Sequence, residues 1–139
     1  MAKSLFYRLF GVGKIPEPLM SQLKNEGVIL FDEGVKGSVT YRNFRAPGKR
    51  FSLRRQWFTG SIALTKTRLL GLMYSNTIIN VPLADERIRA MHYSLEGDDG
   101  VCVAFDPALF HSDWSGTIQY RFRTPQSRQL MELLQAQTT

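Results

Sequence analysis

Apolar and polar side chains alternate along most of this chain, which predicts β-strands. The alternation is clearest at 117–123, where every second residue is apolar and the residues between them are polar or charged. Groups of Gly, Pro, Asn and Asp separate such segments and predict turns. The pattern indicates a mainly β protein in which about seven or more antiparallel strands form a barrel or split sandwich. We expect strands at 28–31, 38–44, 51–57, 61–73 (as a hairpin), 78–81, 88–95, 101–105 and 117–123.

The segment 51–57 has a mixed face. Phe51, Leu53 and Trp57 share their parity with Arg55. Three large apolar groups predict that this face turns inward. We therefore expect either a bulge near Arg54 and Arg55, or an Arg55 whose stem follows the edge of the core while its head reaches water.

A helix is predicted at the C-terminal end of the sequence. Thr124 is a suitable N-cap and Pro125 a suitable first helical residue. The apolar stripe that follows consists of Leu130, Met131, Leu133 and Leu134. A helix with one apolar face needs a surface to cover, so we expect it to lie over the open mouth or seam of the sheet.

Two short helices are predicted before the first strand. The second runs from about residue 17 and ends at Gly27, a residue typical of helix C-termini. The first spans 3–10, where one helical face carries Leu5, Phe6, Leu9 and Phe10. That face is a candidate contact for a membrane or a partner, or it packs back onto its own domain. We divide the chain into an N-terminal helical extension (1–26) and one compact domain (27–139).

Positive charge is concentrated in the middle of the chain. Residues 34–84 contain nine Lys or Arg and no Asp or Glu, whereas 85–139 contain five bases against eight acids. Such segregation produces a local positive potential that attracts anions, unless acids of the C-terminal third face these bases in the fold. The candidate anion-binding or lipid-binding residues are Arg42, Arg45, Lys49, Arg50, Arg54, Arg55, Lys66 and Arg68.

The composition of the chain indicates the compartment in which the protein is expected. The single cysteine, Cys102, cannot form an intrachain disulfide, which favours a reducing, cytoplasmic compartment. No run approaches the ~20 apolar residues of a membrane-spanning helix. We expect a cytoplasmic protein that associates with a membrane, if at all, at its surface.

Catalytic and metal-binding patterns are not found. The two histidines, His92 and His111, lie nineteen residues apart, and each is better explained as a structural or exposed side chain than as a metal ligand. The adjacent acid pairs at 32–33 and 98–99 point their side chains apart and form no acid–base dyad. We predict a non-enzymatic protein without a metal or a cofactor.

Three segments resemble one known family. The sequence Gly-Ser-Ile-Ala-Leu-Thr-Lys-Thr-Arg-Leu at 60–69 is similar to a strand and Leu-Thr-x-x-Arg-Leu turn of the bacterial pleckstrin-homology-like and GRAM families. Ile-Asn-Val-Pro-Leu at 79–83 and Tyr-Arg-Phe at 120–122 extend the resemblance over about residues 37–137. It implies a pleckstrin-homology-like fold with a C-terminal helix. Eukaryotic members often bind phosphoinositides through basic residues, a pattern that Lys36 and the Arg-Asn-Phe-Arg segment at 42–45 resemble loosely.

The Leu-Thr-x-x-Arg-Leu turn also has a structural explanation. We expect Leu64 and Leu69 to be buried on either side of it and the Thr65 hydroxyl to satisfy turn amides. Lys66 and Arg68 are expected to remain in solvent or to flank a ligand.

These observations favour a binding module whose basic face engages an anionic membrane surface or an acidic protein. One alternative is a protein-interaction or self-assembly module that uses an exposed strand edge or the N-terminal helix. Nucleic-acid binding is a minor alternative, because cations and aromatics interleave from Arg42 to Trp57. The predicted inward orientation of Phe51 and Trp57 speaks against it.

Overall fold

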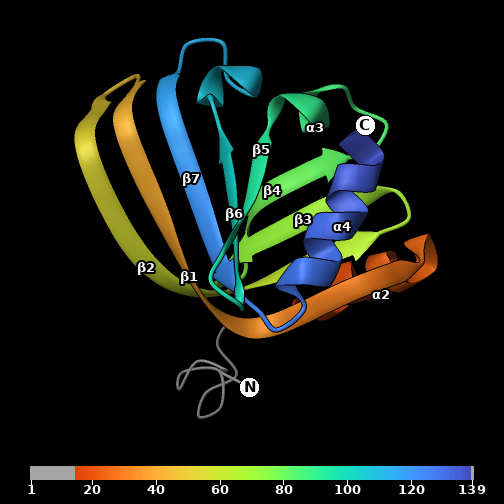
Figure 1. Ribbon diagram of the computed structural model, residues 1–139. Coiled ribbons are helices and arrows are strands. Elements are labelled where there is room, and N and C mark those ends of the chain that lie inside the picture. The colour runs from red at the N-terminus through yellow and green to blue at the C-terminus, as the bar shows by residue number, and fades with distance from the viewer. Residues whose placement is uncertain (1–14, 139) are drawn as a thin grey trace.

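The computed structural model describes residues 15–138, which form one open antiparallel sheet with helices packed against it (Figure 1). The sheet has seven strands in the order β4-β3-β2-β1-β7-β6-β5. The strands are β1 (Val28–Ala46), β2 (Lys49–Thr65), β3 (Arg68–Met73), β4 (Asn76–Pro82), β5 (His92–Glu96), β6 (Gly100–Phe105) and β7 (Ser115–Arg123). The helical elements are α2 (Glu17–Glu26), α3 (Arg87–Ala90), η1 (Pro107–Leu109) and α4 (Ser127–Thr138). A mainly β protein with a C-terminal helix is confirmed.

The two longest strands, β1 and β2, are paired along almost their whole length. Their register runs from Val28 opposite Thr65 to Ala46 opposite Lys49. The expected turn at 32–34 is wrong, because Gly34 adopts a left-handed conformation (φ 70°) beside a register shift and the strand continues through it. The expected strands at 28–31 and 38–44 are therefore one strand. On β2, the segment 51–57 likewise continues into the first half of the predicted 61–73 hairpin.

The main core lies on one face of the sheet, which we call the inner face. Ile62, Leu64 and Leu69 project into it and are almost completely buried. Leu130 and Leu134 of α4 belong to the same cluster, so the C-terminal helix covers this face (Figure 1). The expectation that this helix covers the sheet with its apolar face is thereby confirmed.

A second, smaller core lies on the opposite side, the outer face. Ala63, Leu70 and Leu72 alternate with the inner-face residues and pack against Leu23 of α2. The predicted end of α2 is confirmed: Gly27 is left-handed (φ 89°), and its N–H donates to the carbonyls of Leu23 and Lys24. Helix α2 thus covers the outer face at the β3 end of β2 and leaves the remainder open.

Two other expected elements differ from those observed. The predicted strand at 88–95 begins instead with the short helix α3, and β5 starts at His92. Tyr93 donates its hydroxyl to the carbonyl of Ile88, which ties β5 back to α3. Helix α4 begins at Ser127 rather than at the predicted Pro125. The Thr124 hydroxyl accepts the N–H of Gln126 at 3.2 Å but also donates to buried Asp32 at 2.7 Å, so it joins two distant segments.

The alternation of buried and exposed side chains along β1 is interrupted at Asn43, which has a φ of 49°. Arg42 is exposed whereas Phe44 is buried, although the two residues have the same parity. Gly116 of β7 lies directly against this point, and a Cβ there would collide with the carbonyl oxygens of Arg42 and Asn43. Its φ of 106° also favours glycine. The close approach of β7 therefore needs a residue without a side chain.

Replacement of Gly116 by Ala is expected to destabilise the fold by at least about 2 kcal/mol, because the new methyl group forces β7 away from β1 and adopts an unfavourable φ. Gly97→Ala is the matched control: Gly97 also has a positive φ (66°), but a Cβ there meets no atom within 4 Å. It is expected to cost about 1 kcal/mol. Equilibrium urea denaturation measures both values, and equal costs would contradict the role given to the close contact.

Candidate anion-binding surface

Six predicted basic residues lie exposed on the part of the β1–β2 hairpin nearest its turn at 47–48. We call them the hairpin cations: Arg42, Arg45, Lys49, Arg50, Arg54 and Arg55. In Figure 1 this end of the hairpin lies at the end of the sheet away from α2 and α4. The hairpin cations thus occupy a region of the surface that these two helices leave uncovered.

The hairpin cations are distributed over both faces and the tip. Arg45 and Arg50 stand directly opposite each other, and Lys49 follows in the next cross-strand pair. Like charges at opposed positions repel each other, which costs stability and concentrates positive potential at the tip. Arg55 belongs to the outer face, and the Arg54 guanidinium lies over the Phe51 ring at 4.8 Å.

Four acids of the C-terminal third pair with bases of the same third. Arg121 bonds Glu96 at 2.9 Å, Arg87 bonds Asp85 at 2.6 Å, and longer contacts join Arg128 to Asp98 and Arg123 to Asp99. Within residues 15–138, none of the hairpin cations forms an ion pair. No carboxylate among these described residues neutralises their charge through an ion pair.

An aromatic cluster anchors the tip of the hairpin. Phe44 stacks on Phe51, with ring centroids 5.9 Å apart, and meets Trp114 edge-on at 5.5 Å. Tyr41 lies 5.0 Å from Phe44. Trp114 belongs to the loop before β7, and His111 of the same loop stacks on it at 3.9 Å. The cluster fixes the tip against this loop.

The predicted inward orientation of Leu53 and Trp57 is wrong. Their side chains are 64% and 65% exposed. Phe58 faces the main core, so Leu53, Arg55 and Trp57 lie on the outer face, and Trp57 stands opposite Ser38. Phe51, nearer the tip, packs against the main core and stacks on Phe44, so its predicted inward orientation is confirmed. The predicted bulge near Arg54 and Arg55 is absent from the β1–β2 register, in which the two shifts lie near Leu30 and Gly34.

A pocket of about 240 Å³ opens on the outer face beside Trp57. We call it the outer-face pocket. Its lining combines basic, aromatic and small residues from β1, β2 and β7 with the end of β5 and the start of β6: Lys36, Gly37, Ser38, Arg55, Trp57, Phe58, Glu96, Gly100, Val101, Arg121, Phe122 and Arg123. The alternation at 117–123 already places Arg121 and Arg123 outward. Their convergence with Lys36 depends on the pairing of β1 with β7, which the sequence does not show.

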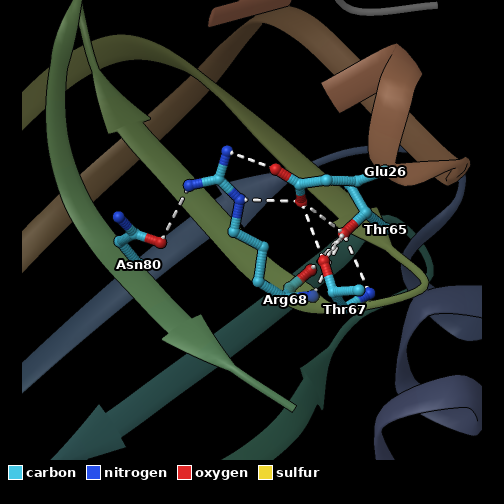
Figure 2. Close-up of polar contacts among 5 residues, drawn as sticks. All are labelled: Glu26, Thr65, Thr67, Arg68 and Asn80. Carbon is cyan, nitrogen blue, oxygen red and sulfur yellow. Dashed lines mark hydrogen bonds and ion pairs between the residues drawn. The ribbon is translucent and has the colours of Figure 1, made fainter. Parts of the chain in front are cut away.

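Lys66 and Arg68 lie at the opposite end of β2 and do not join the hairpin cations. The prediction that Arg68 stays in solvent or flanks a ligand is wrong, because its guanidinium forms an ion pair with Glu26 at 2.9 Å and donates to Asn80 at 3.1 Å (Figure 2). Lys66 is exposed, and its backbone N–H donates to Gly27.

The prediction for Thr65 is confirmed. Its fully buried hydroxyl accepts the N–H groups of Thr67 at 3.1 Å and Arg68 at 3.0 Å (Figure 2). It also donates to Glu26 at 3.0 Å, as the Thr67 hydroxyl does at 2.9 Å. The turn and the C-terminal end of α2 are thus joined by one hydrogen-bonded group.

The charge of Glu26 is stabilised within this group. Burial favours the neutral carboxyl, but hydrogen bonds from Arg68, Thr67 and Thr65 outweigh it and hold the pKa of Glu26 below its ordinary value of 4.5. A carboxylate whose pKa falls on folding stabilises the protein above its unfolded pKa, and this contribution is lost as the pH falls through the folded pKa.

The remaining observations concern the N-terminal segment, Cys102, metal ligands and membrane spans. The predicted contact residues Leu5, Phe6, Leu9 and Phe10 lie outside the described residues. Burial raises the pKa of the Cys102 thiol, and Arg121 offsets this only in part. In the part of the chain that the structure describes, no group of three His, Cys, Asp or Glu side chains could hold a metal ion. No helix in the same range is both long and apolar enough to cross a bilayer.

No protein-family model matches the sequence, and no curated protein matches it.

Glu26→Gln is expected to lower the free energy of unfolding by about 1–2 kcal/mol at pH 7, because it removes the charge that Arg68 contacts. The difference from the unsubstituted protein should shrink as the pH falls below 4.5, the ordinary pKa. Urea denaturation across this pH range measures it. Glu132→Gln, at an exposed position on α4, is the control and should change stability little at any pH. A pH-independent deficit in Glu26→Gln would contradict the electrostatic account.

Proposed function

We propose that this protein is a non-catalytic binding module of pleckstrin-homology-like fold whose hairpin cations engage an anionic membrane surface. The observation that carries the proposal is the set of six exposed bases, none of which forms an ion pair within residues 15–138. Bases near an anionic leaflet contribute about 1 kcal/mol each.

The architecture supports the pleckstrin-homology-like assignment. Seven antiparallel strands are followed by one C-terminal helix that packs on the inner face. The Leu-Thr-x-x-Arg-Leu turn has the buried leucines and the amide-binding threonine that its sequence predicts. The long β1–β2 hairpin presents basic residues at its free end, away from both larger helices.

Two exposed apolar side chains favour a membrane over an acidic protein. Leu53 stands opposite Arg42 on the outer face, and Trp57 lies under the Arg55 guanidinium at 4.4 Å from its ring centroid. Indole rings prefer the boundary between headgroups and acyl chains, and leucine gains free energy on leaving water. Bases interleaved with such groups suit a surface that is anionic outside and apolar beneath.

Arg45→Glu combined with Arg50→Glu is expected to weaken binding to vesicles of phosphatidylcholine and phosphatidylserine by at least about tenfold. Cosedimentation at two salt concentrations measures the affinity, which should fall with added salt because the attraction is screened. Lys24→Glu combined with Arg89→Glu changes the net charge equally at exposed sites on α2 and α3, and it should weaken binding much less.

Two results would contradict the membrane proposal. One is the absence of binding to anionic vesicles at low salt. The other is equal weakening by the hairpin pair and the control pair, because that result would show a response to net charge rather than to the hairpin.

A further inference from the structure

The outer-face pocket brings together charges that are far apart in the sequence. The β1–β2 register places Ser38 opposite Trp57, and the β1–β7 register places Ser38 opposite Arg121. Lys36 and Arg123 lie one step further along their strands on the same face. Three adjacent strands therefore supply the basic and aromatic walls of one concavity of about 240 Å³.

The pocket carries an excess of positive charge. Lys36, Arg55, Arg121 and Arg123 line it, and Glu96 is its one lining carboxylate within residues 15–138. Glu96 is engaged by Arg121 at 2.9 Å. Arg123 has only a long contact, 3.9 Å, with Asp99, which does not line the pocket. Lys36 forms no ion pair with any described residue. Lys36, and Arg123 with only this long contact, can therefore bind a further anion.

Two lining side chains are held in place before any ligand arrives. Arg121 donates to Glu96 and, from Nη1, to the buried hydroxyl of Thr40 at 3.2 Å, which fixes its guanidinium. The Arg55 guanidinium lies over the indole of Trp57. A ligand entering here therefore loses less free energy to side-chain ordering.

Trp57 adds an apolar wall to this cationic pocket. Its indole is 65% exposed, which is unusual for a large aromatic group that gains free energy on burial. A ligand with a planar or apolar carbon group would cover part of it. The volume lies below the ~300 Å³ at which pockets for drug-sized molecules begin, so the ligand is small.

We propose that the outer-face pocket binds a small organic phosphate monoester, with the phosphate between Lys36 and Arg123 and the carbon group against Trp57. A monoester carries nearly two negative charges at neutral pH and three acceptor oxygens. It therefore matches two bases, Lys36 and the weakly paired Arg123, better than a single carboxylate does. Arg55 and Trp57 belong both to this pocket and to the proposed membrane surface, but the tip residues Arg45 and Arg50 do not line the pocket, so the two proposals can be tested separately.

The test is a titration of the full chain with phenyl phosphate, inorganic phosphate and benzoate, followed by calorimetry and tryptophan fluorescence. Phenyl phosphate is expected to bind one saturable site more tightly than either of the others, because only it has both the dianion and the ring. Lys36→Ala combined with Arg123→Ala should weaken its binding at least about tenfold. Trp57→Leu should reduce the preference for phenyl phosphate over inorganic phosphate.

Arg45→Ala combined with Arg50→Ala is the matched control and should leave phenyl phosphate binding unchanged while weakening vesicle binding. Circular dichroism and urea denaturation confirm that each variant is folded. Absence of saturable phenyl phosphate binding would overturn the proposal. So would binding that the tip variant abolishes and the Lys36 and Arg123 variant leaves intact. Neither result bears on the membrane proposal, which the vesicle experiment with the Arg45 and Arg50 variant tests separately.

Vesicles distinguish a soluble ligand from a lipid headgroup. Phosphatidic acid presents a phosphate monoester, whereas phosphatidylglycerol presents a diester with a single negative charge. A preference for phosphatidic acid that is lost on replacing Lys36 and Arg123 assigns the pocket to a lipid. Phenyl phosphate binding that requires the same two residues, without that preference, assigns it to a soluble monoester.

Discussion

The pairing of β1 with β2 is the constraint on which the other features depend. Side chains alternate between the faces of a strand, so a slip of one residue would exchange the inner and outer faces along β2. Ile62 and Leu64 would then leave the main core, and Trp57 would enter it. The same register places Arg45 opposite Arg50 at the tip, where the two charges repel each other. The apolar pairs nearer β3 offset that repulsion and maintain the alignment.

The outer face of β2 changes character along its length. Near β3 it is apolar and lies under α2, through Ala63 and its neighbours on β3. From Trp57 towards the tip it is cationic and open to solvent. Glu26 at the end of α2 bonds Thr65, Thr67 and Arg68, so the helix is held at one end of this face. The part of β2 near β3 therefore contributes to the core, whereas the part near the tip forms an exposed surface suited to binding.

Features set by local sequence were predicted well. The alternation at 117–123, the glycine that ends α2 and the amide-binding role of Thr65 each depend on residues a few positions apart. Features set by distant partners were not predicted. Glu26 precedes Arg68 by 42 residues. The sequence suggested Arg68 as a ligand-binding residue, but its pairing with Glu26 gives it a structural role. The orientation of Trp57 depends on its pairing with Ser38 across the hairpin. Three apolar residues of the same parity indicate a buried face only where the core extends beneath that face.

Cys102 gives the outer face a chemical reporter. It stands opposite Arg121 in the β6–β7 pair, is 4% exposed, and is the one cysteine of the chain. Because burial raises the pKa of its thiol, alkylation at neutral pH requires both exposure of the thiol and loss of a proton. The rate of modification therefore reports how often this position opens to solvent beside the outer-face pocket. The chain thus contains a single-site probe of local opening that needs no engineered label.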